Sequence, residues 1–330
     1  MPIDRRRILG ALAAPALLAA PRLPRAQGSV TWRIATEYPA SAMPGEGIAA
    51  FAAAATRLAA GALVVQPGFD APDGLRSAGM LDAVSGGRIE AADAFTGAMG
   101  GQDSLFLLSS LPFLTASAED ARRLFEVARP HYAAALERRG AVPLYATPWP
   151  PSGLWTRRPV ISRQDLAGLK LRCFDSTGVA VLRAAGAAAE ELSFADTMPR
   201  LAAGTLDAVM SSGDGGAGRR LWQWLPHFTA LDYAWPLSLS FCSAAALARL
   251  PEGARRAVMA AGAEADARQW QAIRSRLAEN EAVMRANAVT THQPDPALRA
   301  ALREAAAQTI AGWEAQAGEA GRAVIRAYRG

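Results

Sequence analysis

Short apolar runs and helical repeats alternate in the first third of the chain. The apolar runs predict strands at Thr31–Tyr38, Ala62–Gln66 and Ile89–Phe95. Between them, apolar residues spaced three or four positions apart predict helices at Ile48–Ala60 and Leu75–Val84. This β-α-β-α-β order predicts a parallel sheet with helices on its faces.

A proline cluster at residues 147–151 separates this series from a second one of the same kind. A predicted helix at Ala118–Arg139 and a predicted strand at Val142–Ala146 precede the cluster. Beyond it, the pattern predicts strands at Leu154–Thr156, Leu169–Phe174, Ala187–Leu192, Ala208–Ser211 and Leu237–Ser243, with helices at Thr177–Ala185 and Ser193–Ala203. We interpret the cluster as the point where the chain crosses from one lobe to another.

A long helical repeat from Gly253 to about Asn287 follows these strands, and a last helix is expected at about Ala297–Tyr328. At about 1.5 Å per residue the long helix would be a rod of roughly 50 Å, longer than one small domain is wide. We expect two α/β lobes: residues 28–148 completed by about 236–262, and residues 149–235 completed by about 276–330. Such lobes, joined by crossing strands and the long helix, form a clamshell with a ligand cleft between them.

A charged and then apolar segment at the start of the chain predicts a secretory leader. Asp4 and Arg5–Arg7 precede an apolar run from Ile8 to Ala20, with small residues near Gln27. The run is broken by Pro15, and it is shorter than the roughly 20 residues of a membrane span. The arginines favour the twin-arginine route. We therefore expect cleavage after residues 1–27 and a mature protein in the periplasm.

The charge of the chain resides largely in this leader. The whole chain of 330 residues has a formal net charge of +5, and removing the leader takes away five arginines and one aspartate. The remainder is close to neutral and has no aromatic-interleaved basic patch, so no nucleic-acid partner is expected. The three histidines and two cysteines lack metal-ligand spacing, so no metal or cofactor is expected. Cys173 and Cys242 lie in apolar runs, and we expect buried free thiols rather than a disulfide.

An ordered series of motifs runs through most of the chain. Residues 159–172 read PVISRQDLAGLKLR, and residues 201–208 read LAAGTLDA. Leu111–Phe113 and Leu81–Val84 precede them, and Ala185–Ala187 lies between them. The series resembles the substrate-binding proteins of tripartite ATP-independent periplasmic (TRAP) transporters, of the C4-dicarboxylate-binding type.

The resemblance implies both a fold and a function. The fold would be the α/β periplasmic-binding-protein clamshell, two-lobed, with crossing strands and one long helix spanning both lobes. The function would be to bind a small carboxylate by hinge closure and to deliver it to the small and large membrane permease subunits. The carboxylate-binding arginine of the family falls at Arg172. A guanidinium holds a carboxylate with two parallel N–H bonds, which lysine cannot do.

The other residues expected in the pocket narrow the substrate. Sialic-acid-binding relatives have a second arginine where Ser152 stands and an asparagine where Ser211 stands, so this pocket is expected to be less charged. Further expected lining residues are aromatic or hydroxylated: Tyr38, Phe95, Trp149, Ser211, Ser212, Tyr233 and Trp235. Together they predict a monocarboxylate with an apolar or aromatic body, or a keto or hydroxy acid.

Two alternatives remain open from the sequence. Gly213–Gly218 satisfies G-x-G-x-x-G after a short strand, as in an exported dinucleotide-dependent oxidoreductase. The helix expected next, about Ala217–Trp224, is cut short by Pro226, so we interpret the run as a flexible, glycine-lined cleft loop. The second alternative is a ligand sensor subunit that reports to a kinase. We expect a monomer without enzyme activity.

Overall fold

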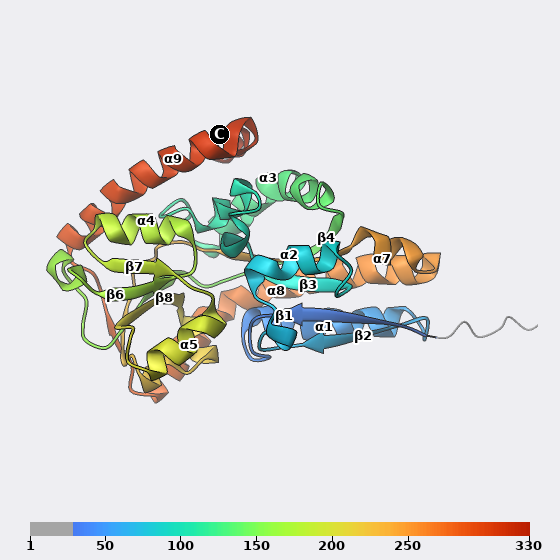
Figure 1. Cartoon of the computed structure of the whole chain (residues 1–330), viewed down its shortest axis with the longest axis horizontal. Coiled ribbons are helices and arrows are strands. Elements are labelled where there is room, and N and C mark those ends of the chain that lie inside the picture. Colours follow the sequence, from blue (N-terminus) through green and yellow to red (C-terminus); the bar gives the residue numbers. More distant parts are fainter. Residues whose placement is uncertain (1–28) are drawn as a thin grey trace, which may run out of the picture.

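The computed structural model describes residues 29–330 and places two β-sheets side by side along its long axis, each with helices packed on it (Figure 1). The leader predicted over residues 1–27 lies outside the described residues. The arrangement is the two-lobed α/β fold that the sequence predicts.

The first sheet and its helices form what we call the first lobe. Its five strands lie in the order β2 (Leu63–Gly68), β1 (Val30–Thr36), β3 (Ala91–Phe95), β10 (Leu237–Ser243) and β4 (Ala141–Pro148). β1 pairs in parallel with β2 and β3, as the predicted β-α-β-α-β order indicates. In contrast, β10 is antiparallel to both of its neighbours. The helices of this lobe are α1 (Met43–Leu58), α2 (Ser77–Ser85), α3 (Ala118–Glu137) and α7 (Ala244–Arg249).

The second sheet and its helices form the second lobe. Its strands lie in the order β11 (Thr290–His292), β9 (His227–Thr229), β5 (Ser152–Thr156), β8 (Ala208–Ser212), β6 (Lys170–Cys173) and β7 (Ala188–Glu191). Helices α4 (Ser176–Ala184), α5 (Phe194–Ala202) and α6 (Gly213–Gly218) belong to it. β6 is parallel to β7 and β8, so the carboxyl ends of these three strands meet at one edge.

Two extended segments connect the lobes. β4 ends at Pro148 in the first sheet and β5 begins at Ser152 in the second, so the proline cluster is a crossing, as predicted. The chain returns through residues 230–236. The N–H of Trp149 donates to the Pro236 carbonyl at 2.9 Å, and the N–H of Ser152 donates to the Ala234 carbonyl at 2.9 Å. The two crossings are therefore held together by backbone hydrogen bonds.

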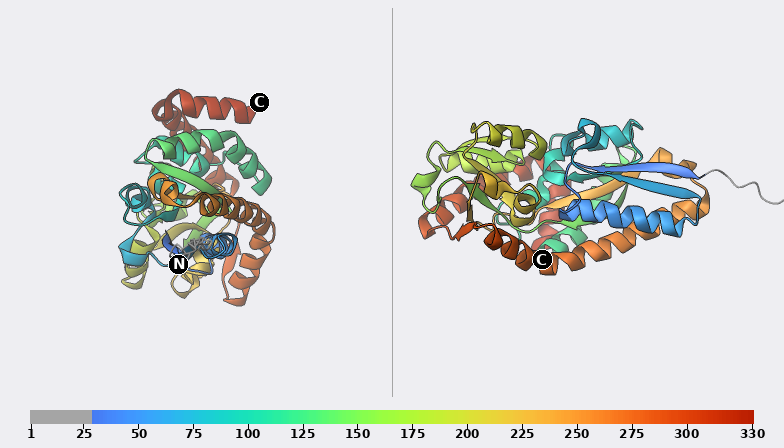
Figure 2. Two further views of the ribbon diagram at one scale, coloured as in Figure 1. Left: turned by 90° about the vertical axis from the view of Figure 1, so that its right-hand side faces the viewer. Right: turned by 90° about the horizontal axis from the view of Figure 1, so that it is seen from below.

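Helix α8 (Glu252–Ala286) spans both lobes, as predicted from its length (Figure 2). Its first half packs on α1 and β4, where a Cβ on Gly262 would lie 2.8 Å from the Leu144 carbonyl oxygen. Glycine at this position therefore allows the close approach of helix and strand. Near the other end, Met284 belongs to the apolar cluster of the second lobe.

Helix α9 (Pro296–Arg329) packs on both lobes, whereas the sequence predicted that residues from about 276 to 330 complete the second lobe. Its first half packs on α4, but Trp313, Val324 and Tyr328 belong to the apolar cluster of the first lobe. The helix is interrupted at Gly318 (φ 61°, ψ −150°), a left-handed conformation that glycine adopts without a steric cost. The break redirects the last turns onto α3.

The run Gly213–Gly218 is also a correction, because it forms helix α6 rather than a flexible loop. Close packing explains why glycine is used in this helix. A Cβ on Gly216 would lie 2.2 Å from the Trp155 ring, and a Cβ on Gly215 would lie 2.4 Å from Ser211 Oγ. The Ser212 hydroxyl caps the helix by accepting from the N–H of Gly215 at 3.1 Å.

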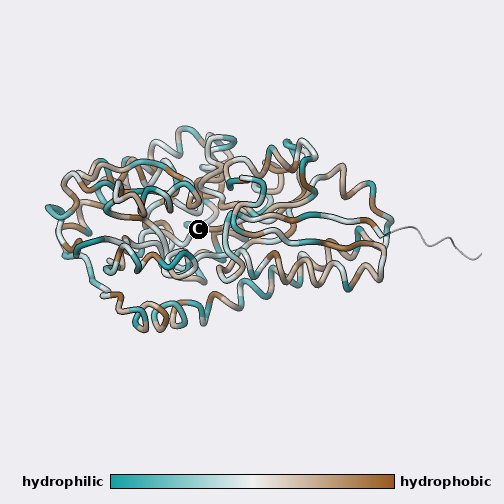
Figure 3. Tube along the Cα trace, turned by 60° about the horizontal axis from the view of Figure 1, so that its bottom comes forward, coloured by the Kyte–Doolittle hydropathy of each residue, from teal (hydrophilic) through white to brown (hydrophobic). Residues whose placement is uncertain are grey.

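Apolar residues gather in the strands of the interior, and polar and apolar residues alternate along the outer helices (Figure 3). Cys173 and Cys242 are buried free thiols, as expected. Within residues 29–330, no helix has the length and apolarity needed to cross a membrane.

Candidate ligand-binding site

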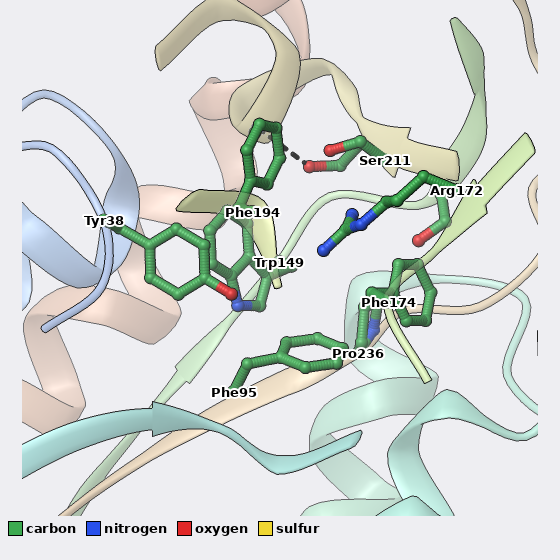
Figure 4. Close-up of a pocket in the computed structure, with 11 residues that line it drawn as sticks. Tyr38, Phe95, Trp149, Arg172, Phe174, Phe194, Ser211 and Pro236 are labelled. Atoms are coloured by element: carbon green, nitrogen blue, oxygen red, sulfur yellow. Dashed lines mark hydrogen bonds between the residues drawn. The ribbon is translucent and has the colours of Figure 1, made fainter. Parts of the chain in front are cut away.

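A small cavity lies between the two lobes, with about 320 Å³ of space when the part open to solvent is included. Its walls come from both sheets and from both crossings: Tyr38, Phe95, Trp149, Ser152, Arg172, Phe174, Phe194, Ser211, Ser212, Gly215 and Pro236 (Figure 4). The cavity therefore lies in the position where a clamshell holds its ligand.

Arg172 reaches the cavity from β6. Its backbone pairs with Glu190 of β7 and Val209 of β8, close to the carboxyl ends of these parallel strands. Ligands of open α/β sheets bind at this end. Figure 4 shows the guanidinium pointing into the space between Phe194, Trp149 and Tyr38.

The guanidinium of Arg172 is fixed by the backbone of its own lobe. Nε donates to the Leu192 carbonyl at 2.8 Å, and Nη1 donates to the Met210 carbonyl at 3.1 Å. Arginine has five N–H donors in a planar fork, so donors on both terminal nitrogens stay available. These donors can hold a carboxylate end-on with two parallel bonds.

The charge of Arg172 has no carboxylate partner among the described residues, although the side chain is only 3% exposed. Its guanidinium lies over the Phe194 ring, 5.0 Å from the centroid. Burial lowers the pKa of Arg172, and the nearby Tyr38 and Glu37 oppose this effect. Arginine nevertheless stays protonated in proteins. A buried cation that makes no direct ion pair is costly, so the site is suited to an anion.

Hydroxyl groups line the wall next to the guanidinium. Ser211 and Ser212 end β8, and Ser152 begins the neighbouring β5, where it pairs with Ser212. The Ser212 hydroxyl is occupied as the cap of α6. Because Gly215 has no Cβ, the Ser211 hydroxyl has room beside α6. These hydroxyls can donate to or accept from a neutral polar group on a ligand.

Aromatic rings form the rest of the wall. Tyr38 meets Trp149 edge-on with centroids 4.7 Å apart, and Trp149 Nε1 donates to the Ser238 hydroxyl at 3.0 Å. Phe95 of the first lobe meets Phe174 of the second lobe edge-on at 5.1 Å. Rings from both lobes therefore close around the space that Arg172 faces.

Six of the eight residues predicted for the site line the cavity: Tyr38, Phe95, Trp149, Arg172, Ser211 and Ser212. Tyr233 and Trp235 do not, which corrects the prediction. Tyr233 is fully buried and meets Phe113 edge-on, whereas Trp235 belongs to the apolar cluster of the first lobe. Alternate residues of an extended segment face opposite sides, so Pro236 lines the cavity while its neighbour Trp235 faces away.

Several lining residues were not among the predicted site residues. Phe174 directly follows β6, the strand of Arg172, and Phe194 is the first residue of α5. Ser152 was expected only as the position where sialic-acid-binding relatives have a second arginine. Phe194 follows Ser193, the N-cap of α5. The Ser193 hydroxyl does accept from the N–H of Asp196 at 3.0 Å.

The fold and the cleft define a class, the bacterial solute-binding proteins. Residues 34–316 match the family described as bacterial extracellular solute-binding protein, family 7 (DctP), so the chain belongs to this family. The match confirms the resemblance to TRAP substrate-binding proteins. No curated protein matches the chain.

Solved structures give the same result. A Bordetella pertussis receptor, DctP7, described as binding pyroglutamic acid, has a TM-score of 0.88 and 26% identity over 92% of this chain and 100% of its own. A TRAP solute-binding protein from an unidentified marine microbe, described as specific for pyroglutamate, has a TM-score of 0.87 and 25% identity over 91% and 99% of the two chains.

A Ralstonia eutropha TRAP protein, described with bound (S)-2-acetolactate, has a TM-score of 0.83 at 22% identity, over 91% of this chain and 98% of its own. At this identity the likeness shows the fold alone. The relatives are described as solute receptors rather than enzymes. Nothing in these comparisons supports a dinucleotide-dependent oxidoreductase or a sensor of a kinase.

Proposed function

We propose that the protein is the periplasmic receptor of a TRAP transporter and that it binds a small monocarboxylate with a compact body. The observation that carries this proposal is Arg172, a buried guanidinium that faces the cavity without a carboxylate partner among the described residues. The receptor releases its ligand, unchanged, to the small and large membrane permease subunits.

The choice of a monocarboxylate rests on the composition of the wall. Arg172 is the single charged residue among the lining residues, and the others are aromatic, hydroxylated, glycine or proline. A second carboxylate would be buried without a cationic partner, which is unfavourable. A body with a carbonyl, hydroxyl or amide group suits the hydroxyls of Ser152 and Ser211. The two relatives described with pyroglutamate agree with this chemistry, because pyroglutamate is a cyclic monocarboxylate with an amide.

Isothermal titration with L-pyroglutamate, a 2-oxo acid, a 2-hydroxy acid and succinate tests the substrate class. We expect one of the monocarboxylates to bind with a dissociation constant of about 1 μM or lower, and succinate to bind at least about tenfold more weakly. Tighter binding of succinate or malate than of every monocarboxylate would contradict the proposal.

The remaining parts of the proposal have their own tests. We propose that residues 1–27 are cleaved on export, which mass spectrometry of the periplasmic protein measures. We also propose a monomer, which analytical ultracentrifugation tests, and an absence of catalysis. A ligand that is recovered unchanged in its NMR spectrum after long incubation supports the last point, and a converted ligand refutes it.

A further inference from the structure

Glu37 is a buried acid that lies just outside the cavity, directly after β1 and next to Tyr38. It is 2% exposed. Its two carboxylate oxygens accept from two different backbone N–H groups, Oε2 from Ser77 at 3.0 Å and Oε1 from Ala195 at 3.1 Å. The acid is thus held by two hydrogen bonds from distant parts of the chain.

The two donors begin helices of different lobes. Ser77 is the first residue of α2, whose side chains Met80 and Leu81 belong to the cluster of the first lobe. Ala195 is the second residue of α5, whose Phe194 and Leu201 belong to the cluster of the second lobe. A helix N-terminus carries unpaired N–H groups and a partial positive charge, so each one stabilises a carboxylate.

Glu37 supplies a cap that α2 does not provide for itself. The residue before α2 is Arg76, which makes no capping hydrogen bond with its side chain. Arg76 instead forms a two-pronged pair with Asp196 of α5, with N–O distances of 2.9 and 3.4 Å. The contact between α2 and α5 therefore has the buried Glu37 carboxylate at its centre and the more exposed Arg76–Asp196 ion pair at its rim.

A third element of the second lobe holds the backbone of Glu37. Arg219, which follows α6, donates to the Glu37 carbonyl at 2.7 Å and pairs with Asp70 of the first lobe at 2.8 Å. Its guanidinium also lies 5.8 Å from the centroid of the Phe194 ring, and Phe194 is the residue that covers Arg172. Glu37 is therefore linked, through the first turn of α5, to the Phe194 ring that covers the Arg172 guanidinium.

We propose that Glu37 is a positioning residue that holds the closed form by bridging α2 and α5, and that it thereby slows ligand release. The bond to Ala195 exists only while the lobes are together, whereas the bond to Ser77 lies within the first lobe. Opening the cleft must break the bridge and resolvate one carboxylate oxygen. The inference rests on the proposed function, because it concerns the release of that ligand.

Stopped-flow tryptophan fluorescence with L-pyroglutamate, or with whichever member of the panel binds, measures the two rate constants. Glu37→Asp keeps the charge but is too short to span both helices, and Glu37→Gln keeps the length but replaces one acceptor by a donor. A hydrogen bond to a charged group is worth enough to change an equilibrium by about 10- to 100-fold. We expect koff to rise by about that factor in both variants, with kon changed less than about threefold.

Glu90→Gln is the matched control. Glu90 Oε2 also accepts a backbone N–H, that of Arg33 at 2.8 Å, but both residues belong to the first lobe. Its koff is expected to equal that of the wild type. Arg76→Gln, which removes the exposed rim, is expected to raise koff less than the Glu37 variants do.

The result that overturns the inference is a koff for both Glu37 variants equal to that of Glu90→Gln, in a wild-type protein that binds the probe. A general structural defect would raise koff, lower kon and also lower the unfolding free energy of the ligand-free variant by an amount equivalent to the change in koff. That combination of results in the Glu37 variants would also overturn the inference. If the wild type bound no member of the panel, the proposed function itself would fall.

Discussion

The second lobe gives the cavity its guanidinium and its serine hydroxyls, whereas the first lobe gives it Tyr38 and Phe95. The groups that can recognise a carboxylate are therefore concentrated on one lobe. Arg172 is also fixed by carbonyls of that same lobe, so its orientation does not depend on closure. We infer that a ligand binds first to the second lobe and that the first lobe then covers it.

The two lobes also bury opposite charges in different ways. Arg172 stays a cation beside an empty space, whereas Asp93 in the centre of the first sheet is enclosed by hydroxyls. Asp93 accepts from Thr36 Oγ1 at 3.3 Å and from Ser240 Oγ at 2.9 Å, and it is fully buried. Burial raises the pKa of Asp93 to about 7. Of these two buried groups, only Arg172 lines the cavity and is available to a ligand.

The largest expected effect is the loss of ligand affinity when the charged lobe is altered. Arg172→Met removes the partner of a buried carboxylate and should weaken binding by about 2–5 kcal/mol. Tyr38→Phe, on the covering lobe, should change the dissociation constant less than about threefold. Isothermal titration of both variants measures the difference. Equal losses for the two variants would refute the division of roles between the lobes.

Asp93→Asn tests the buried acid of the first lobe. The folded pKa of about 7 lies above the unfolded value of about 3.9, so the folded protein holds the proton more tightly. This carboxyl group contributes stability at low pH that is lost as the pH rises through about 7. We expect the wild type to lose about 2–4 kcal/mol relative to Asp93→Asn between pH 4 and pH 8.

Urea unfolding of the wild type and Asp93→Asn at both pH values measures this difference, and the comparison of the two proteins cancels the titration of other groups. A difference in unfolding free energy that does not change with pH would show that Asp93 is ionised throughout.

A double-mutant cycle on Phe95 and Phe174 measures a contact between the lobes that carries no charge. The rings meet edge-on at 5.1 Å, a geometry worth about 0.5–1.5 kcal/mol beyond buried area. We expect a coupling of that size in the free energy of ligand binding with the two leucine variants. Additive effects would indicate that the rings do not meet in the closed, ligand-bound protein.

The smallest effect is expected in the chemical labelling of the two cysteines, of which one lies in each sheet. Cys173 and Cys242 are fully buried, and burial raises the pKa of both thiols, that of Cys242 to about 12. Both should resist a thiol reagent in the folded protein and react fully after unfolding. Rapid labelling of Cys173 without ligand would show that the second lobe opens locally around β6.

Local pattern was sufficient to predict most of the fold. The short apolar runs became the strands of two sheets, and the proline cluster became the crossing between β4 and β5. The length of α8 predicted that it spans both lobes. The motif that ends at Arg172 placed the guanidinium of the cavity, because Arg172 lies near the carboxyl end of β6, where ligands of α/β sheets bind.

The errors arose where packing decides the outcome. Gly213–Gly218 has low helix propensity, but the Trp155 ring leaves no room for larger residues and the Ser212 hydroxyl caps the turn. Tyr233 and Trp235 lie in the extended segment that borders the cavity, but their side chains do not line it. The last turns of α9 fold onto α3 after the break at Gly318, and no periodicity in the sequence indicates where a kinked helix leads.

Titration of a carboxylic acid and its uncharged methyl ester into the wild type and Arg172→Met tests most directly whether the guanidinium of the second lobe recognises the ligand. With pyroglutamic acid as the probe, we predict that the wild type prefers the acid by about 2 kcal/mol or more and that Arg172→Met loses this preference. An equal preference for the acid in both proteins would contradict the account.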